Sequence, residues 1–137
     1  MSLRLWQEHA VPRLADASLK GREVGELRGK ACAGLTGRVL EVGFGGGLNI
    51  RWYPAGVTSV TAIEPADVGW RLSQKRRERT GLPIDRAGLD GQSLDVAGGS
   101  HASALFTFSL CTIPDPVLAL REARRVLRPG GRLHFLE

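Results

Sequence analysis

The chain has 137 residues, of which 42% are hydrophobic and 24% are charged. These proportions are ordinary for one globular domain with its own core, so they exclude the collagen-like, disordered and transmembrane classes. The formal net charge is +5. A basic balance is compatible with nucleic-acid binding. However, the densest arginines lie on two amphipathic segments without interleaved aromatic side chains, which favours a solvent-facing role for them and makes a nucleic-acid partner unlikely.

Two cysteines, Cys32 and Cys111, stand far apart in the sequence and match no metal-binding spacing, so no metal site is expected. Unlinked thiols suit a reducing compartment. The sequence also contains neither a signal-peptide pattern nor a run of 18 uncharged apolar residues. We therefore expect a cytoplasmic protein without a membrane span.

Residues 1–36 are predicted to form one or two helices, interrupted at Pro12, Gly21, Gly29 and Gly34, that cap the domain. Residues 37–137 are predicted to be the core, with strands at 38–42, 59–63, 84–89, 104–108 and 132–136 and with helices over 48–53, 67–80 and 115–127. Strands and helices that alternate at this spacing predict right-handed crossovers. The predicted fold is therefore a three-layer α/β sheet that is mostly parallel and has helices on both faces.

Apolar spacing predicts which side of each helix is buried. In the helix over 67–80, Val68 and Leu72 are expected to face inward. In the last helix the expected buried positions are Val117, Leu118, Leu120, Ala123, Val126 and Leu127.

The segment Leu40–Gly47 reads LEVGFGGG, a strand that runs into a glycine turn before a helix start. Glycine lets the backbone approach a ligand closely, and the free N–H groups of a helix start point at that ligand. Glu64 follows at the end of the next strand, where a carboxylate can accept hydrogen bonds from ribose hydroxyls. The turn and this acid together predict an adenosine-containing cofactor.

The spacing within the turn discriminates between cofactors. A dinucleotide site requires G-x-G-x-x-G, and Leu48 occupies the position of its third glycine. Glu41 is an unusual residue for a buried strand. We expect it to hold the backbone of the turn or a cationic ligand group, and the alternative is a structural carboxylate that caps local N–H groups.

Val39–Gly47 resembles motif I of the Rossmann-like (class I) S-adenosylmethionine-dependent methyltransferases. The run Leu110–Glu137 is similar to the corresponding segment of the small-molecule branch, which contains the ubiquinone-biosynthesis-type and thiol methyltransferase-like proteins. Arg125–Gly131, which reads RVLRPGG, is its most characteristic part. The resemblance covers roughly residues 37–137. It implies S-adenosyl-L-methionine as cofactor and transfer of its methyl group to a small-molecule nucleophile by in-line displacement, which requires no catalytic triad.

The resemblance also implies the cofactor-binding residues. They are Glu41, Gly43, Phe44, Gly45, Gly47 and Asn49 around the turn, Glu64 and Pro65 after the second strand, Asp90, Gly91 and Gln92 after the third, and Phe108, Ser109 and Leu110 after the fourth. No catalytic residue is assigned. The acceptor pocket is expected between residues 108–111 and the N-terminal segment.

Several alternatives stay open. Trp6, Trp52 and Tyr53 could wall the acceptor pocket, or Trp52 and Tyr53 could pack the first helix on the sheet. His9, His101 and His134 are scattered, and structural or surface roles are expected for them. The alternative function is a non-catalytic or truncated S-adenosylmethionine-binding domain, ahead of a nucleic-acid methyltransferase or a dinucleotide oxidoreductase.

The sheet of this family usually has seven strands, and the chain ends at Glu137, in or just after the predicted fifth. We therefore expect five strands in the order 3-2-1-4-5, with the C-terminal hairpin missing. The fifth strand would be an exposed edge, through which two copies could pair.

Overall fold

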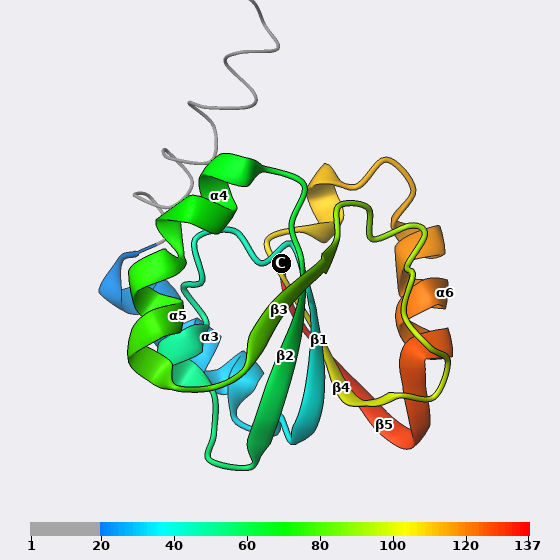
Figure 1. The fold of residues 1–137 in the computed structure, drawn as a ribbon, viewed down its shortest axis with the longest axis horizontal. Coiled ribbons are helices and arrows are strands. Elements are labelled where there is room, and N and C mark those ends of the chain that lie inside the picture. The colour runs from blue at the N-terminus through cyan, green and yellow to red at the C-terminus, as the bar shows by residue number, and fades with distance from the viewer. Residues whose placement is uncertain (1–19) are drawn as a thin grey trace, which may run out of the picture.

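The computed structural model describes residues 20–137 (Figure 1). The predictions for Trp6, His9 and the rest of residues 1–19 lie outside the described residues. In chain order the elements are α3 (Arg22–Cys32), β1 (Gly37–Val42), η2 (Ile50–Trp52), β2 (Val57–Ile63), α4 (Asp67–Leu72), α5 (Gln74–Thr80), β3 (Ile84–Gly88), β4 (His101–Thr107), η3 (Leu110–Thr112), α6 (Pro116–Val126) and β5 (Leu127–Leu136).

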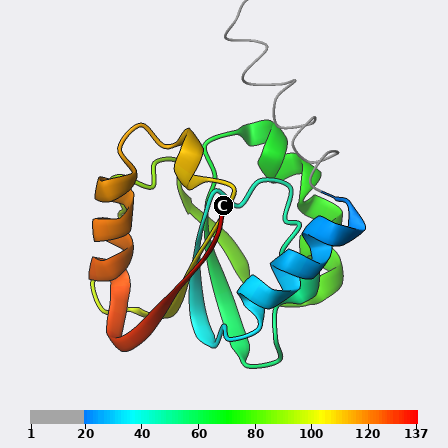
Figure 2. The ribbon, with the colours of Figure 1, turned by 180° about the vertical axis from the view of Figure 1, so that it is seen from behind.

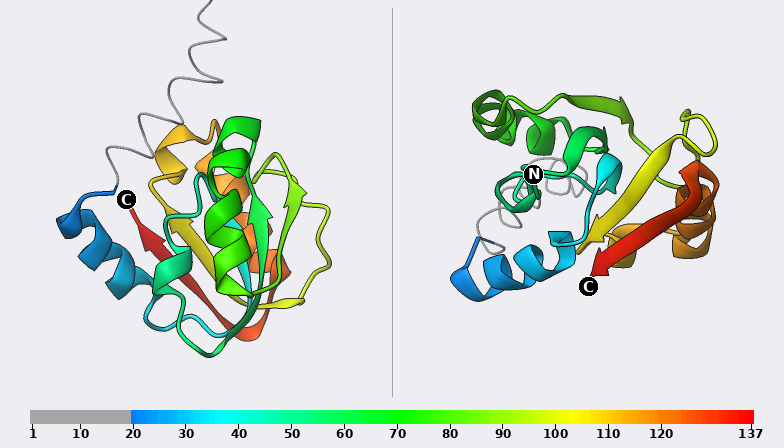
Figure 3. Two further views of the ribbon diagram at one scale, coloured as in Figure 1. Left: turned by 60° about the vertical axis from the view of Figure 1, so that its left-hand side comes forward. Right: turned by 90° about the horizontal axis from the view of Figure 1, so that it is seen from below.

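The five strands form one parallel sheet in the order β3-β2-β1-β4-β5, which confirms the predicted order. The sheet separates two helical layers: α6 lies on one side, and α3, α4 and α5 lie on the other (Figures 2 and 3). The fold is the predicted three-layer α/β arrangement.

Neighbouring positions along β1 supply two different cores. Val39 packs with Cys32 of α3 in one hydrophobic cluster, whereas Leu40 packs with Ala119 of α6 in the other. All seven residues of β4 are buried. Burial on both faces is what a central parallel strand requires, because helices cover both sides of it.

Two of the helix predictions are wrong in detail. The helix predicted over 67–80 is two helices that meet at Ser73, whose hydroxyl donates a hydrogen bond to the carbonyl of Trp70 (2.6 Å) and so competes with regular helix bonding. Leu72 is 37% exposed and does not face inward. In α6 the buried stripe is Ala119, Ala123 and Val126, so the preceding Val117 and Leu118 lie on the other side, 54% and 42% exposed.

The predicted interruption at Gly29 is wrong, because α3 runs through it, whereas Gly21 and Gly34 lie outside the two ends of the helix. Gly25 and Gly29 lie against the Trp52 ring, where added Cβ atoms would stand 3.1 and 2.9 Å from the nearest ring carbons. The residues after the glycine turn form only the short 3₁₀ helix η2, not the predicted α-helix.

The last strand is longer than predicted and begins at Leu127, directly after α6. Pro129 and Gly130 therefore lie within β5, at an irregularity in its pairing with β4. Such residues are tolerated there because β5 is an edge strand. Of the helices described, none is long and apolar enough to span a membrane.

Candidate functional site

The glycine turn connects the end of β1 to η2 and uses backbone conformations that favour glycine. Gly43, Gly45 and Gly47 have φ angles of 78°, 55° and 73°. A Cβ on Gly43 would lie 2.4 Å from Cβ of Ser109, at the end of β4. The N–H of Gly43 donates to the carbonyl of Ile63 in β2 (2.9 Å). The turn is therefore held against both neighbouring strands.

A cavity of about 450 Å³ opens beside this turn, at the carboxyl ends of the strands. In Figure 1 this is the upper end of the sheet. Ligands of open parallel sheets bind at this edge, and the volume is typical of a small-molecule site. Most of the predicted cofactor residues line the cavity: Gly43, Phe44, Gly45, Glu64, Pro65, Asp90, Gly91, Gln92, Phe108 and Ser109. Glu41, Gly47, Asn49 and Leu110 do not line it.

Glu64 lies at the cavity wall and is only 6% exposed. Its carboxylate accepts hydrogen bonds from the backbone N–H groups of Gly45 and Ala66, the latter at 2.8 Å. Burial raises the pKa of Glu64, and these two N–H donors oppose the rise. Because a carboxylate offers about four lone-pair positions, Glu64 still has acceptor capacity for a ligand hydroxyl.

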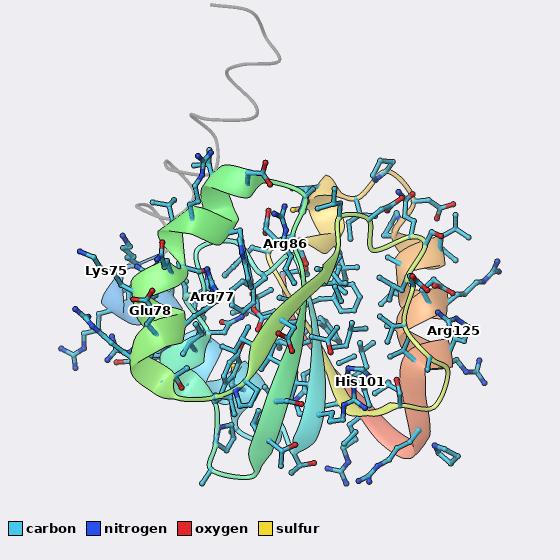
Figure 4. All side chains as sticks on the ribbon, in the orientation of Figure 1. Lys75, Arg77, Glu78, Arg86, His101 and Arg125 are labelled. Atoms are coloured by element: carbon cyan, nitrogen blue, oxygen red, sulfur yellow. The ribbon has the colours of Figure 1, made fainter. Side chains whose placement is uncertain are left out.

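Arg86 of β3 fixes the backbone of Glu64. Its Nε and Nη2 donate to the Glu64 carbonyl at 2.9 and 2.6 Å, and its Nη1 donates to Asp67 at 2.7 Å. Figure 4 shows Arg86 at the upper end of β3. Its hydrogen bond holds the pKa of the Asp67 carboxyl below its usual value. Arg86 is therefore a positioning residue behind the acidic wall of the cavity.

The loop after β3 supplies another wall. Oδ1 of Asp90 accepts hydrogen bonds from the backbone and side-chain N–H groups of Gln92 at 2.8 and 3.1 Å, and Oε1 of Gln92 accepts one from the N–H of Asp115 at 3.0 Å. An added Cβ on Gly91 would lie 2.7 Å from Val42. The loop is thus held between Val42 of β1 and Asp115 at the start of α6.

Glu41 and Asn49 form a buried network beneath the turn. The Glu41 carboxylate accepts hydrogen bonds from Nδ2 of Asn49 (2.7 Å) and from the Tyr53 hydroxyl. Burial raises the pKa of Glu41 to about 7, although both hydrogen bonds oppose this. The hydrogen-bond partners of Glu41 that the structure shows are therefore side chains. A contact between Glu41 and a cationic ligand group stays a prediction.

Arg28 of α3 lines the cavity and was not predicted. Its Nη1 donates to Asn49 (2.8 Å) and Thr107 (3.2 Å), and its guanidinium carbon lies 5.2 Å from the centre of the Phe108 ring. The side chain therefore ties α3 to the turn and to the end of β4. One arginine among many on a weakly patterned helix gives no sequence signal for this role.

The loop after β4 is anchored at three points. Phe108 has a positive φ of 50°, and the Ser109 hydroxyl donates to the carbonyl of Val42 (3.0 Å). The N–H groups of Ser109 and Leu110 both donate to Oε1 of Glu137 at 3.0 Å. The Leu110 side chain packs against the core on the α6 side. These bonds fix Phe108 and Ser109 at the cavity wall.

The tryptophan, tyrosine and histidine residues that the sequence singled out do not line this cavity where they are described. The Trp52 ring packs against Gly25 and Gly29 of α3 and lines a second cavity. The Tyr53 hydroxyl donates to Glu41. A role of Trp52 as a wall of the acceptor pocket stays a prediction. His101 is buried at the opposite end of the sheet (Figure 4), with Thr61 2.7 Å from its Nε2. His134 lies 2.9 Å from the carbonyl of Ala31. Among residues 20–137, no group of His, Cys, Asp and Glu side chains could hold a metal ion.

Comparison with known proteins adds the following. A family model described as "Methyltransferase domain" matches residues 40–135. Thiol S-methyltransferase TMT1B of Homo sapiens is 37% identical over 113 residues, which cover 79% of this chain and 46% of that protein. The chain thus spans about half the length of the curated relatives it matches.

The solved structures that are similar to this chain include a methyltransferase and a cyclase. The first, from Thermotoga maritima, is a SAM-dependent methyltransferase and possible histamine N-methyltransferase, with a TM-score of 0.69 and 26% identity over 91% of this chain and 56% of that one. The second, the cyclase SpnF, has a TM-score of 0.69 and 27% identity over 82% of this chain and 43% of that one. The fold therefore occurs in both methyltransferases and a cyclase.

Proposed function

The chain belongs to the methyltransferase domain family, and we propose that its cavity binds S-adenosyl-L-methionine for methyl transfer to a small-molecule nucleophile. One observation carries the proposal. The glycine turn and Glu64 meet at one wall of the cavity, where the N–H of Gly45 donates to the Glu64 carboxylate. Bare backbone and an acid at this edge of a parallel sheet suit the ribose of an adenosyl group.

The residues present fit the cofactor. Gly43, Gly45 and Gly46 present backbone rather than side chains to the cavity, and Glu64 has acceptor capacity for the ribose hydroxyls. The pinned loop over 90–92 would hold the adenine. Glu41 and Asn49 do not line the cavity, and Asn49 joins Glu41 to Arg28, which does line it.

The bound cofactor supplies a methyl group on a positively charged sulfur, which a nucleophile displaces in line. The protein has to bind the cofactor and the nucleophile, orient them toward each other and exclude water. Positioning alone reaches effective molarities of about 10⁵ M or more in well-oriented systems. Phe108, Ser109 and Ile113 form the side of the cavity contributed by the loop after β4. We assign no catalytic base, because none is needed when the nucleophile arrives deprotonated.

For the acceptor we propose a thiol as the first class to test. The support is the human relative TMT1B, a thiol S-methyltransferase that is 37% identical to this chain. Binding of the cofactor without methyl transfer is the second candidate function. It is favoured by the similarity to SpnF, a cyclase.

Three further assignments are proposals. We place the protein in the cytoplasm because Cys32 and Cys111 are both free, as a reducing compartment favours. We retain a division into an N-terminal cap, 1–36, and a core, 37–137, because α3 precedes the sheet and packs on β5 and η2.

As the third proposal, two copies of the chain pair through the edge strand β5. Its side chains Leu133 and Phe135 are 41% and 64% exposed. Sedimentation at high protein concentration should then detect dimers. A strict monomer would contradict the contact.

Isothermal titration with S-adenosylhomocysteine tests cofactor binding. We expect binding by the wild type and a loss of about tenfold or more in Glu64→Gln, because a charge-assisted acceptor is removed. Glu78→Gln is the matched control, since Glu78 is exposed on α5 and does not line the cavity. Absence of binding by folded wild type would overturn the proposal. If binding is seen, turnover with small thiols separates the two candidate functions.

A further inference from the structure

A second cavity, of about 760 Å³, lies between α3, η2 and α5, the helices on the left in Figure 1. Within residues 20–137, the cationic side chains that line it are Lys20, Arg28, Arg51, Arg76 and Arg79. Lys20, Arg28 and Arg76 also have other partners, so Arg51 and Arg79 carry the argument for a bound anion. Among the residues described, no carboxylate lines it. One sign of charge lining a concave surface concentrates counter-ions there, and arginine matches phosphate and carboxylate oxygens with paired N–H donors.

The cationic wall is built on fixed elements. Nη1 of Arg76 donates to the carbonyl of Gly46 at 2.6 Å, which ties α5 to the glycine turn. The guanidinium carbon of Arg51 lies 5.0 Å from the centre of the Trp52 ring. That ring lies against Gly25 and Gly29 of α3, at contact distance. The arrangement therefore differs from a run of arginines on one solvated helix face.

The second cavity adjoins the first. Arg28 and Leu48 line both cavities, and the turn presents Gly46 to the first and Gly47 to the second. A ligand in the second cavity would therefore lie one backbone turn away from the proposed cofactor.

We infer that the second cavity is an anion-binding subsite that receives a phosphate or carboxylate group of the methyl acceptor. This inference rests on the proposed function, which gives the first cavity to the cofactor. It narrows the acceptor to small molecules that carry a negative charge in addition to the nucleophile. Arg51 and Arg79 are the specificity-determining residues, because they enter from η2 and α5 and do not line the cofactor cavity.

Titration with inorganic pyrophosphate, with and without S-adenosylhomocysteine, tests the subsite in the intact chain. We expect Arg51→Gln and Arg79→Gln each to weaken pyrophosphate binding by about tenfold, as loss of a charge-assisted hydrogen bond predicts. S-adenosylhomocysteine affinity should stay within about twofold, because binding energies of groups without shared partners are independent. Arg121→Gln is the matched control: it removes the same charge from an exposed position on α6 and should change neither affinity.

A second measurement tests whether a carboxylate on the acceptor is recognised. With 4-mercaptobenzoate and thiophenol as acceptors, the ratio of their kcat/KM values should favour the charged thiol and fall in Arg51→Gln but not in Arg121→Gln. Pyrophosphate binding that is undetectable, or equally sensitive to Arg121→Gln, would overturn the inference. The inference would also be overturned if Arg51→Gln weakened the binding of an oligonucleotide but left pyrophosphate binding unchanged. If pyrophosphate binds but S-adenosylhomocysteine does not, the proposed function is contradicted and the anion site is still supported.

Discussion

Substituting Gly43 with alanine tests how tightly the glycine turn is held against β4. Gly43 has a φ of 78°, and an added Cβ would lie 2.4 Å from Cβ of Ser109, far inside contact distance. The left-handed conformation costs alanine about 1–2 kcal/mol. Overpacking adds about 1–3 kcal/mol. We expect Gly43→Ala to lower the free energy of unfolding by about 2–5 kcal/mol, which is a large part of the stability of a small domain.

Gly99→Ala is the control, because Gly99 has a similar φ of 65° but no neighbouring atom within 4 Å of an added Cβ. It should show only the conformational cost of about 1–2 kcal/mol. Urea unfolding followed by circular dichroism measures both variants. Ser109→Gly, added to Gly43→Ala, should recover part of the loss. Equal destabilisation by Gly43→Ala and Gly99→Ala would refute the packing argument.

The remaining predictions concern titration and positioning. Burial raises the pKa of Glu41 to about 7 from an ordinary 4.5, so the wild type should lose on the order of 3 kcal/mol as pH rises between these values. Between pH 5 and 7.5 the free energy of unfolding should change less in Glu41→Gln than in the wild type. An equal change in both proteins would contradict the raised pKa of Glu41. Arg125 and a backbone N–H hold the pKa of Glu122 at about 2, so this contribution is lost as pH falls from about 4.5 to 2. The Tm difference between wild type and Glu122→Gln should therefore vanish near pH 2. Arg86→Ala should weaken S-adenosylhomocysteine binding several-fold by titration calorimetry, because it frees the Glu64 backbone, and unchanged affinity would exclude that positioning role.

The sheet could be predicted because its determinants are local. Each strand is a short apolar run, and strands that alternate with helices predict right-handed crossovers and a parallel sheet. The strand order is implied by the resemblance to the methyltransferase family. The glycine turn and Glu64 could likewise be assigned to one cavity, because both follow neighbouring strands at their carboxyl ends. The assignment of both to one cavity depended on the positions of Gly43 and Glu64 directly after their strands.

The network behind the cavity could not be predicted, because its contacts join residues that are far apart in the chain. Arg28 reaches Thr107, which is 79 positions away, and Glu41 bonds the Tyr53 hydroxyl across the turn. Neither contact leaves a periodic pattern. The break at Ser73 is also hidden in the sequence, since a serine within a helix is ordinary until its hydroxyl bonds the preceding turn.

A crystal structure with S-adenosylhomocysteine would test whether the cavity is a cofactor site. We expect the adenosyl group beside Gly43 and Gly45, with the ribose hydroxyls on the Glu64 carboxylate and the adenine against the loop over 90–92. Ligand density elsewhere, or a ribose that makes no contact with Glu64, would contradict this expectation.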